Sequence, residues 1–161
     1  MIKMDANFIS LFDEKMMLVG AEAANAEEAI KLLGGVMAQE GFVEEAYWED
    51  VYKREQTFPT GLPTQPIAIA IPHADPDRVI KSGIGIAVFK QPVKFRIMGS
   101  NDPDELDVPV VFMMALKDIK QQTAVLRDLL TLIQSKTIVS EIFHADSPKL
   151  ILKIIQDNIK K

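Results

Sequence analysis

The sequence contains no cysteine, which excludes disulfide bonds, thiolate metal sites and a cysteine nucleophile. Histidine is scarce as well, since His73 and His144 are the only two. Zinc sites usually draw on several histidines or cysteines, so we expect neither a metal ion nor another cofactor. No apolar run approaches the ~20 residues of a membrane span, and residues 1–10 lack the apolar core of a signal peptide. These absences predict a soluble, cytoplasmic protein that does not insert into a membrane.

Positive charge is also in short supply. Lysine and arginine number 18 against 23 aspartate and glutamate residues, which gives a net charge of −5 and a pI near 5.1. This balance argues against a nucleic-acid partner, because such proteins usually carry a basic surface. The chain has 161 residues, of which 48% are hydrophobic and 25% charged. That length and composition predict one globular domain over residues 1–161.

Helical and strand patterns are mixed along the chain. Residues 15–19 form a short apolar run that predicts a strand. Asn25, with Glu28 three residues later, predicts the start of a helix that ends near Gly41. A second helix is predicted over residues 43–57.

The second half of the chain contains most of the predicted strands. Residues 57–66 hold three prolines and a glycine, which predicts an irregular connector. Residues 101–107 predict an acidic turn. The pattern of apolar residues predicts an α/β fold with a mixed sheet flanked by helices. The predicted strands are residues 67–71, 84–89 with a continuation at 93–95, and a doubly buried strand at 108–116; the predicted helices are residues 120–135 and a last helix capped by Asp146 or Ser147, with Pro148 in its first turn.

His73 is the residue whose position most suggests chemistry. It directly follows a predicted strand, where α/β proteins commonly place ligands. Pro72 restricts the backbone before it, and Asp75 could orient one imidazole nitrogen and leave the other free as a nucleophile. The alternative is a loop histidine that caps backbone groups. His144 lies just before the last helix, and we interpret it as a loop or cap residue.

Two further charged features allow two interpretations each. Arg54 continues the apolar stripe of the second helix, near its C-terminal end. Either its stem packs while its head reaches water, or its charge is held inward for a partner. The acidic residues Asp102, Asp104, Glu105 and Asp107 are typical of a solvated turn, with a magnesium site as the alternative.

Residues 67–74, Ile-Ala-Ile-Ala-Ile-Pro-His-Ala, resemble the phosphorylation-site motif of the fructose/mannitol class of enzyme IIA, from the bacterial sugar phosphotransferase system. That motif reads apolar-Ala-apolar-Pro-His-small. The Arg54–Glu55 pair resembles the pair that ends the helix before the site. Residues 108–116 and 121–133 are similar to the family's central strand and the helix after it. The resemblance covers residues 8–159.

This resemblance implies the family's α/β fold and the function of a phosphocarrier subunit in sugar uptake. His73 would be the phosphoryl acceptor, which receives the group from phospho-HPr and passes it to a cysteine of an enzyme IIB. Arg54 matches the arginine that stabilises the phosphoryl group, and a planar cation can hold two of its oxygens. Glu55 matches only by its place next to Arg54, and we assign it no role.

The sequence departs from the family pattern at one active-site position. Many members carry a second histidine early in the helix after the central strand. In this sequence Gln121 or Gln122 stands there, and Gln122 fits better. Glutamine can donate a hydrogen bond to a phosphate oxygen but carries no positive charge.

The loop at residues 58–66 is longer than in the mannitol-type pattern. Its Phe-Pro-Thr-Gly-Leu stretch resembles the galactitol-like branch. Enzyme IIB is phosphorylated on cysteine in these branches, so a chain without cysteine implies that enzyme IIB is a separate chain. The membrane component, enzyme IIC, would be another. The alternative function is a regulatory module on the same fold, in which phosphorylation of His73 controls docking to a partner protein.

Overall fold

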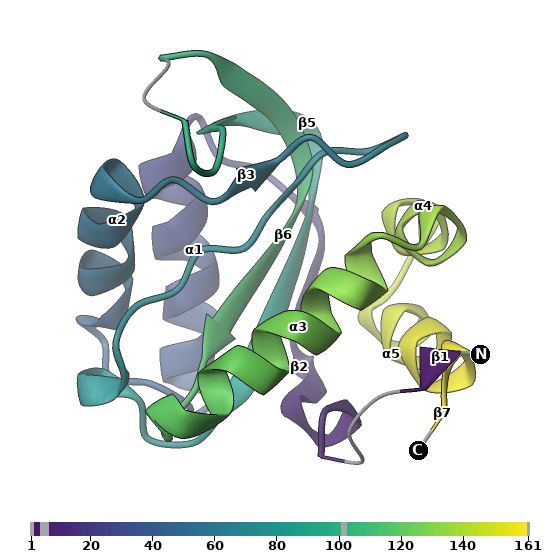
Figure 1. Ribbon diagram of the computed structural model, residues 1–161, viewed down its shortest axis with the longest axis horizontal. Coiled ribbons are helices and arrows are strands. Elements are labelled where there is room, and N and C mark those ends of the chain that lie inside the picture. The colour runs from purple at the N-terminus through teal and green to yellow at the C-terminus, as the bar shows by residue number, and fades with distance from the viewer. Residues whose placement is uncertain (1, 4–6, 101–102, 161) are drawn as a thin grey trace.

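The computed structural model describes residues 2–3, 7–100 and 103–160, and a five-stranded sheet forms its centre (Figure 1). The strands lie in the order β2-β5-β6-β4-β3. Strand β5 is antiparallel to β6, whereas β2 runs parallel to β5 and β4 runs parallel to β6. The sheet is therefore mixed, as predicted. Its strands are β2 (Phe12–Ala21), β3 (Gly61–Leu62), β4 (Ile69–Ala70), β5 (Gly83–Arg96) and β6 (Glu105–Ala115).

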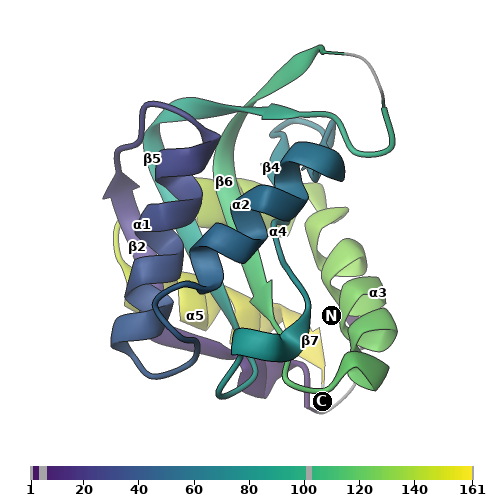
Figure 2. The same cartoon turned by 90° about the vertical axis from the view of Figure 1, so that its left-hand side faces the viewer.

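Helices cover both faces of this sheet (Figure 1). One face carries α1 (Ala26–Gln39) and α2 (Tyr47–Thr57), and the other carries α3 (Gln122–Ile133), α4 (Lys136–His144) and α5 (Pro148–Asn158). Short 3-10 helices lie at Ile9–Leu11, Pro76–Arg78 and Ile119–Gln121. Strands β1 (Ile2–Lys3) and β7 (Ile159–Lys160) pair in parallel, so the first and last described segments lie side by side (Figure 1), and the two ends of the chain are also close in Figure 2. The predicted α/β class is confirmed.

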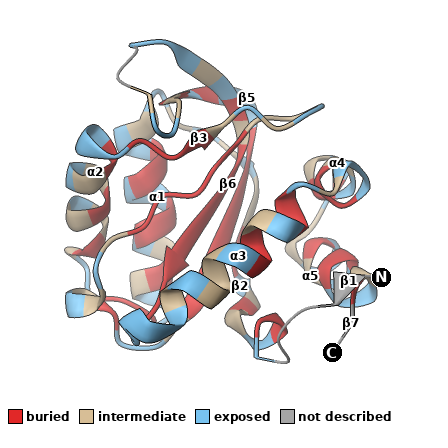
Figure 3. Cartoon of the chain, viewed as in Figure 1, coloured by how far each residue is buried: buried red, intermediate tan, exposed pale blue. Residues whose placement is uncertain are grey.

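The middle strands of the sheet are buried on both faces (Figure 3). Along β5, Ile84 and Ile86 pack toward α3, α4 and α5, whereas Ala87 and Phe89 pack toward α1 and α2. Residues 110–115 of β6 are each at most 1% exposed. The continuous apolar run of β6 therefore separates two hydrophobic cores, as expected for a strand covered on both sides.

The predicted helix boundaries are confirmed where a capping residue marks them. The Asn25 side chain accepts a hydrogen bond of 2.9 Å from the Glu28 backbone N–H at the start of α1. Gly41, just after this helix, has a φ of +85°, a conformation that costs glycine little. Ser147 caps α5 and Pro148 is its first residue, an arrangement that needs no donor from the proline.

The second helix begins at Tyr47, so the predicted start at Val43 is wrong. Val43 instead forms an isolated antiparallel bridge with Val79. The Glu44 backbone N–H donates to the Arg78 carbonyl at 2.9 Å. A loop that is distant in sequence thus binds the backbone at Val43 and Glu44. The local spacing of apolar residues gives no sign of this contact.

The helix predicted at 120–135 corresponds to α3, which follows the 3-10 helix at Ile119–Gln121. Ser135 lies just after α3 and caps the start of a further helix, α4, because its side chain accepts a hydrogen bond of 3.3 Å from the Ile138 N–H. Helix α4 was not predicted. His144 is its last residue rather than a loop residue, and its Nδ1 lies 2.8 Å from the Ser140 carbonyl oxygen.

The acidic turn predicted at 101–107 is wrong in its second half. Glu105 and Asp107 belong to β6, and Asp107 forms a 2.6 Å ion pair with Lys94 on the neighbouring strand. Cross-strand pairs of opposite charge are compatible with the start of a strand. Asp102 lies outside the described residues.

The proline-rich connector at 57–66 contains β3, a strand that the sequence did not predict. It pairs antiparallel with β4. The strand predicted at 67–71 is shorter than expected, since β4 comprises two residues between Pro66 and Pro72. Proline has no N–H to donate to a sheet, and this limits the ladder.

Two strands are longer than the apolar patterns suggest. The run at 15–19 is part of β2, and the run at 84–89 is part of β5, which includes residues 93–95. Polar and small residues at their ends pair with neighbouring strands. Sequence periodicity therefore locates these strands but underestimates their length.

Close approach of α1 to α2 requires glycine at one of two adjacent positions. A Cβ at Gly34 would lie 2.7 Å from the Trp48 Cβ, whereas a Cβ at Gly35 would have no atom within 4 Å. We expect Gly34→Ala to destabilise the fold by about 1–3 kcal/mol, because the helices must separate. Gly35→Ala should stabilise it by about 0.5–1 kcal/mol through helix propensity. Urea unfolding of both variants measures this, and a Gly34→Ala variant as stable as wild type would contradict it.

Candidate active site

His73 lies just beyond β4, at the edge of the sheet where β4 and β6 both end. The carbonyl of Pro72 accepts a hydrogen bond of 3.2 Å from the Met114 N–H and so fastens the chain to β6. The histidine is 9% exposed, so solvent reaches a small part of its side chain. This is the predicted position at the carboxyl end of a strand, where a sheet commonly holds its ligands.

The hydrogen bond of the imidazole assigns its tautomer. His73 Nδ1 lies 2.8 Å from the Ile71 carbonyl oxygen, and a carbonyl only accepts, so Nδ1 carries the hydrogen and Nε2 keeps its lone pair. Burial, reinforced by the charge of Arg54, lowers the pKa of His73 below its usual value. A neutral ring with a free Nε2 is a nucleophile at neutral pH.

The expectation that Asp75 orients the imidazole is wrong. The backbone carbonyl of Ile71 takes that role, and Asp75 is exposed. Its carboxylate still acts on His73 through space, where it raises the pKa less than burial lowers it.

Tyr47 connects three elements behind the histidine. Its hydroxyl donates to the Met114 carbonyl at 2.8 Å and accepts a 3.2 Å hydrogen bond from the Ala74 N–H. The side chain is fully buried, and burial raises its pKa, so the hydroxyl keeps its proton as a donor. Tyr47 thereby holds the residue next to His73 against α2 and β6.

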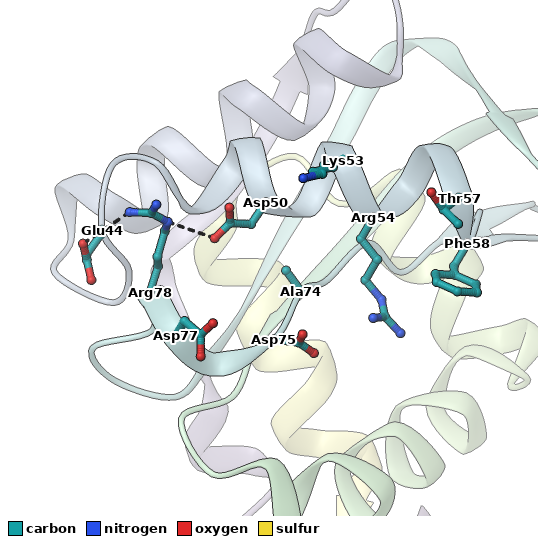
Figure 4. A pocket seen from close by; sticks show the side chains of 10 residues that line it. All are labelled: Glu44, Asp50, Lys53, Arg54, Thr57, Phe58, Ala74, Asp75, Asp77 and Arg78. Carbon is teal, nitrogen blue, oxygen red and sulfur yellow. Dashed lines mark hydrogen bonds and ion pairs between the residues drawn. The ribbon is translucent and has the colours of Figure 1, made fainter.

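Arg54 occupies the last turn of α2 and lines an open pocket of about 580 Å³ (Figure 4). Its side chain reaches between Phe58 and Asp75, with the guanidinium carbon 5.2 Å from the centre of the Phe58 ring. The Nε atom is buried and has no hydrogen-bond partner among the described residues. A buried, unpaired guanidinium donor is costly and is suited to bind an anion.

The positive charge of a second arginine in the same pocket, Arg78, is balanced by acidic side chains of the protein. Arg78 lies 2.9 Å from an Asp50 oxygen and 3.8 Å from a Glu44 oxygen. These ion pairs attach the loop after His73 to α2 and to the turn before it. Arg78 therefore contributes to the shape of the pocket, whereas Arg54 keeps donor capacity.

Gln122 also approaches His73, from the first turn of α3. The two side chains line a small void of about 10 Å³, which is room for about one water molecule. Ala74 borders both this void and the pocket of Arg54. The three predicted site residues therefore converge around Ala74, while Gln121 is exposed and lines a separate hollow.

Glu55, next to Arg54, faces inward and is 6% exposed. Its two oxygens accept 2.7 Å hydrogen bonds from the backbone N–H and the hydroxyl of Thr60. Burial raises the pKa of Glu55 to about 7, and the bonds from Thr60 oppose that rise. Sequence reasoning assigned no role to this residue.

Tyr47 and Glu55 are the contributors that the sequence analysis missed. Both lie on the inward stripe of α2, with Val51 between them at four-residue spacing. A hydroxyl or carboxyl on an otherwise apolar stripe requires a buried partner. That requirement is the sequence signal that could have drawn attention to them.

The described part of the chain contains neither a cluster of metal-ligating side chains nor a membrane-spanning helix. Within it, no group of three or more histidine or acidic residues could hold a metal ion, and Asp104, Glu105 and Asp107 do not form such a cluster. Within the same residues, no helix has the length and apolarity needed to cross a membrane.

The comparison with known families gives one match over most of the chain. Residues 10–158 match the family described as "Phosphoenolpyruvate-dependent sugar phosphotransferase system, EIIA 2". The match includes His73, Arg54 and Gln122 and the helices α1 to α5.

The relatives include proteins named as specific for mannitol and for galactitol. The mannitol-specific EIICBA component of Escherichia coli K12 is 27% identical over 93% of this chain, and this chain spans 22% of that protein. The galactitol-specific EIIA component of the same strain is 26% identical over 81% of this chain and 86% of its own length. The chain thus corresponds to about a fifth of the mannitol relative and to most of the galactitol relative.

A solved structure shares the fold. The Escherichia coli complex of the mannitol enzyme IIA with phosphorylated enzyme IIB contains a chain that is 26% identical to this one, with a TM-score of 0.72. The likeness covers 92% of this chain and all of the other. The predicted resemblance in sequence therefore extends to the three-dimensional structure.

The hydroxyl of Tyr47 can be tested by removing it alone. Tyr47→Phe leaves the Ala74 N–H and the Met114 carbonyl without their partner, so we expect a loss of about 1–3 kcal/mol in the free energy of unfolding. Tyr52→Phe on the same helix is the matched control and should be nearly neutral. Chemical denaturation measures both, and equal stability of the two variants would refute the role of the buried hydroxyl.

Proposed function

The chain belongs to the EIIA type 2 family of the phosphoenolpyruvate-dependent sugar phosphotransferase system, and from this membership we propose that it is a cytoplasmic phosphocarrier subunit. It accepts a phosphoryl group from phospho-HPr on His73 and passes it to a cysteine of a separate enzyme IIB. The observation that carries this proposal is the hydrogen bond from His73 Nδ1 to the Ile71 carbonyl, because it leaves Nε2 free to react.

The reaction at His73 is a phosphoryl transfer between nitrogen atoms and then to sulfur. The Nε2 lone pair attacks phosphorus of the donor, a new N–P bond forms, and the N–P bond to the donor breaks. The Nδ1–H bond to Ile71 keeps the ring in the reactive tautomer throughout. The depressed pKa of His73 keeps the ring neutral before attack. In the second step the enzyme IIB thiolate attacks the same phosphorus and His73 leaves.

Arg54 stabilises the charge of the transferred group. The reaction requires positioning and charge neutralisation more than covalent assistance from the protein. The unpartnered Nε of Arg54 supports this role, as does the Phe58 ring beside the guanidinium. A planar guanidinium also supplies two parallel donors to a phosphoryl group.

Gln122 takes the place of the family's second histidine. Its proximity to His73 supports a hydrogen bond from its amide to a phosphoryl oxygen. The amide adds no positive charge, so Arg54 is the principal source of charge compensation. The rate of transfer should therefore depend more on Arg54 in this chain than in family members that carry the second histidine.

The relatives support the proposed partners and sugar. The solved complex of a mannitol enzyme IIA with its phosphorylated enzyme IIB supports docking of an enzyme IIB on the His73 face.

The match to a galactitol-specific EIIA component over most of its length, with the Phe-Pro-Thr-Gly-Leu stretch at residues 58–62, supports a galactitol-type sugar. The sugar itself would contact the membrane component, enzyme IIC, and not this chain.

Replacement of each histidine tests the acceptor. Intact mass after incubation with phosphoenolpyruvate, enzyme I and HPr should show one acid-labile phosphate on wild type and none on His73→Ala. His144→Ala is the control and should take up phosphate like wild type, because His144 bonds to a carbonyl of α4. Phosphate on a folded His73→Ala variant would overturn the assignment of the acceptor.

Replacement of Arg54 tests the stabilisation of the phosphoryl group. We expect Arg54→Ala to slow phosphate uptake by about 100-fold, as is common when a preorganised donor is removed. Lys53→Ala removes an exposed cation of the same pocket and should leave the rate close to that of wild type. Rapid-quench measurement of the phosphorylated fraction gives both rates. Equal slowing by the two variants would mean that general charge, not Arg54, drives uptake.

A further inference from the structure

Glu55 is buried and does not line the pocket of Arg54, although the two residues are neighbours in α2. Its carboxyl group contacts Thr60, in the connector between α2 and β4, through two hydrogen bonds of 2.7 Å. Glu55 therefore holds Thr60 to helix α2 through both its backbone N–H and its side-chain hydroxyl. We call this pair the Glu55–Thr60 clamp.

A continuous series of hydrogen bonds leads from this clamp to the imidazole. The Thr60 carbonyl accepts from the Ile71 N–H at 3.3 Å. The Ile71 carbonyl accepts from His73 Nδ1 at 2.8 Å. The links lead from α2 to the connector, from the connector to the chain after β4, and from that chain to the reacting ring.

The connector is held firmly on its other side as well. The Met98 N–H donates to the Gly61 carbonyl at 2.8 Å, and a Cβ on Gly61 would lie 2.5 Å from the Arg96 carbonyl oxygen. The connector therefore packs directly against the backbone of β5. Thr60 lies between this contact and Glu55, so its carbonyl has a defined direction.

We propose that Glu55 is a positioning residue for phosphoryl transfer, which acts through Thr60 and Ile71 to hold the His73 ring in the Nδ1–H tautomer. This inference rests on the proposed function of His73. Glu55 touches neither the ring nor the phosphoryl group. Its effect is to fix the carbonyl that selects which imidazole nitrogen remains free. Without the clamp, the Ile71 carbonyl loses its fixed place and the ring populates the other tautomer, in which Nε2 carries the hydrogen and cannot attack.

The chemistry of the clamp predicts which substitution it tolerates. Glutamine can accept from the Thr60 N–H through its oxygen and donate to the Thr60 hydroxyl through its nitrogen, so both contacts survive. The raised pKa of Glu55, about 7, means that a neutral side chain already occurs in much of the population near neutral pH. Glu55→Gln should therefore keep the clamp, whereas Glu55→Ala removes it and Thr60→Val removes one of its two bonds.

The test compares these variants in two readouts at a temperature where all remain folded. Phosphate uptake from phosphoenolpyruvate, enzyme I and HPr gives the rate. Nitrogen NMR of the imidazoles gives the fraction of His73 in the Nδ1–H tautomer, and His144, whose Nδ1 bonds within α4, is an internal reference. Val51→Ala, a cavity on the same helix stripe, is the control for lost stability.

We expect Glu55→Ala to slow uptake by about tenfold or more, as misplacement of a reacting group commonly does, and to lower the Nδ1–H fraction of His73. Thr60→Val should shift both readouts in the same direction by a smaller amount. Glu55→Gln should stay near wild type in both. Val51→Ala should be destabilised with both readouts unchanged.

Three results would overturn the proposal. The first is a wild-type tautomer fraction in folded Glu55→Ala and Thr60→Val. The second is an equal tautomer shift in Val51→Ala, which would show that lost stability alone explains it. The third is a failure of Glu55→Gln to rescue the tautomer. If wild type itself takes up no phosphate, the proposed function fails, but the tautomer comparison still decides whether Glu55 positions His73. If Glu55→Ala does not fold, Thr60→Val against Val51→Ala decides it.

Discussion

The site depends on the backbone of residues 71–74 being held at the carboxyl edge of the sheet by hydrogen bonds from several directions. The connector carbonyl of Thr60 holds Ile71, Met114 on β6 holds Pro72, and Tyr47 on α2 holds Ala74. A buried backbone group without a partner costs free energy, so these bonds determine where the chain after β4 can lie. The imidazole of His73 then takes its direction from the carbonyl that this backbone presents. The imidazole ring is thereby fixed by main-chain geometry rather than by a neighbouring carboxylate.

Two electrostatic requirements meet at the site: the imidazole must stay neutral, and a positive charge must be available for the transferred group. A nucleophilic histidine must be neutral before reaction, and burial together with Arg54 keeps its pKa low. In the proposed reaction the transferred group is an anion, which needs a cation that is not already paired. Arg54 meets this need because its Nε has no partner among the described residues, whereas Arg78 is committed to Asp50 and Glu44. In the proposed reaction the same guanidinium therefore lowers the pKa of the ring before transfer and compensates the phosphoryl charge afterwards.

The sequence predicted much of the fold because its strongest signals are local. The cap at Asn25 and the apolar run of β6 depend on neighbouring residues, and both occur as predicted. The predicted start of the second helix at Val43 was wrong because a tertiary bridge to Val79 holds that backbone. Helix α4 lies beyond the predicted helix at 120–135 and was missed, although the side chain of Ser135 caps its start. Pattern alone does not reveal where a side chain competes successfully for a backbone donor.

The sequence by itself determined the fold class, the family resemblance, and the candidates His73, Arg54 and Gln122, because residue types, spacing and a strand-end motif are local properties. Tertiary structure alone decided which imidazole nitrogen is free and which buried hydrogen bonds Glu55 and Tyr47 form. Those facts depend on contacts between residues that are distant in the chain, such as Tyr47 with Ala74. Hydrogen-bond geometry is specified to a few tenths of an ångström, and only the packed fold brings such groups to that distance.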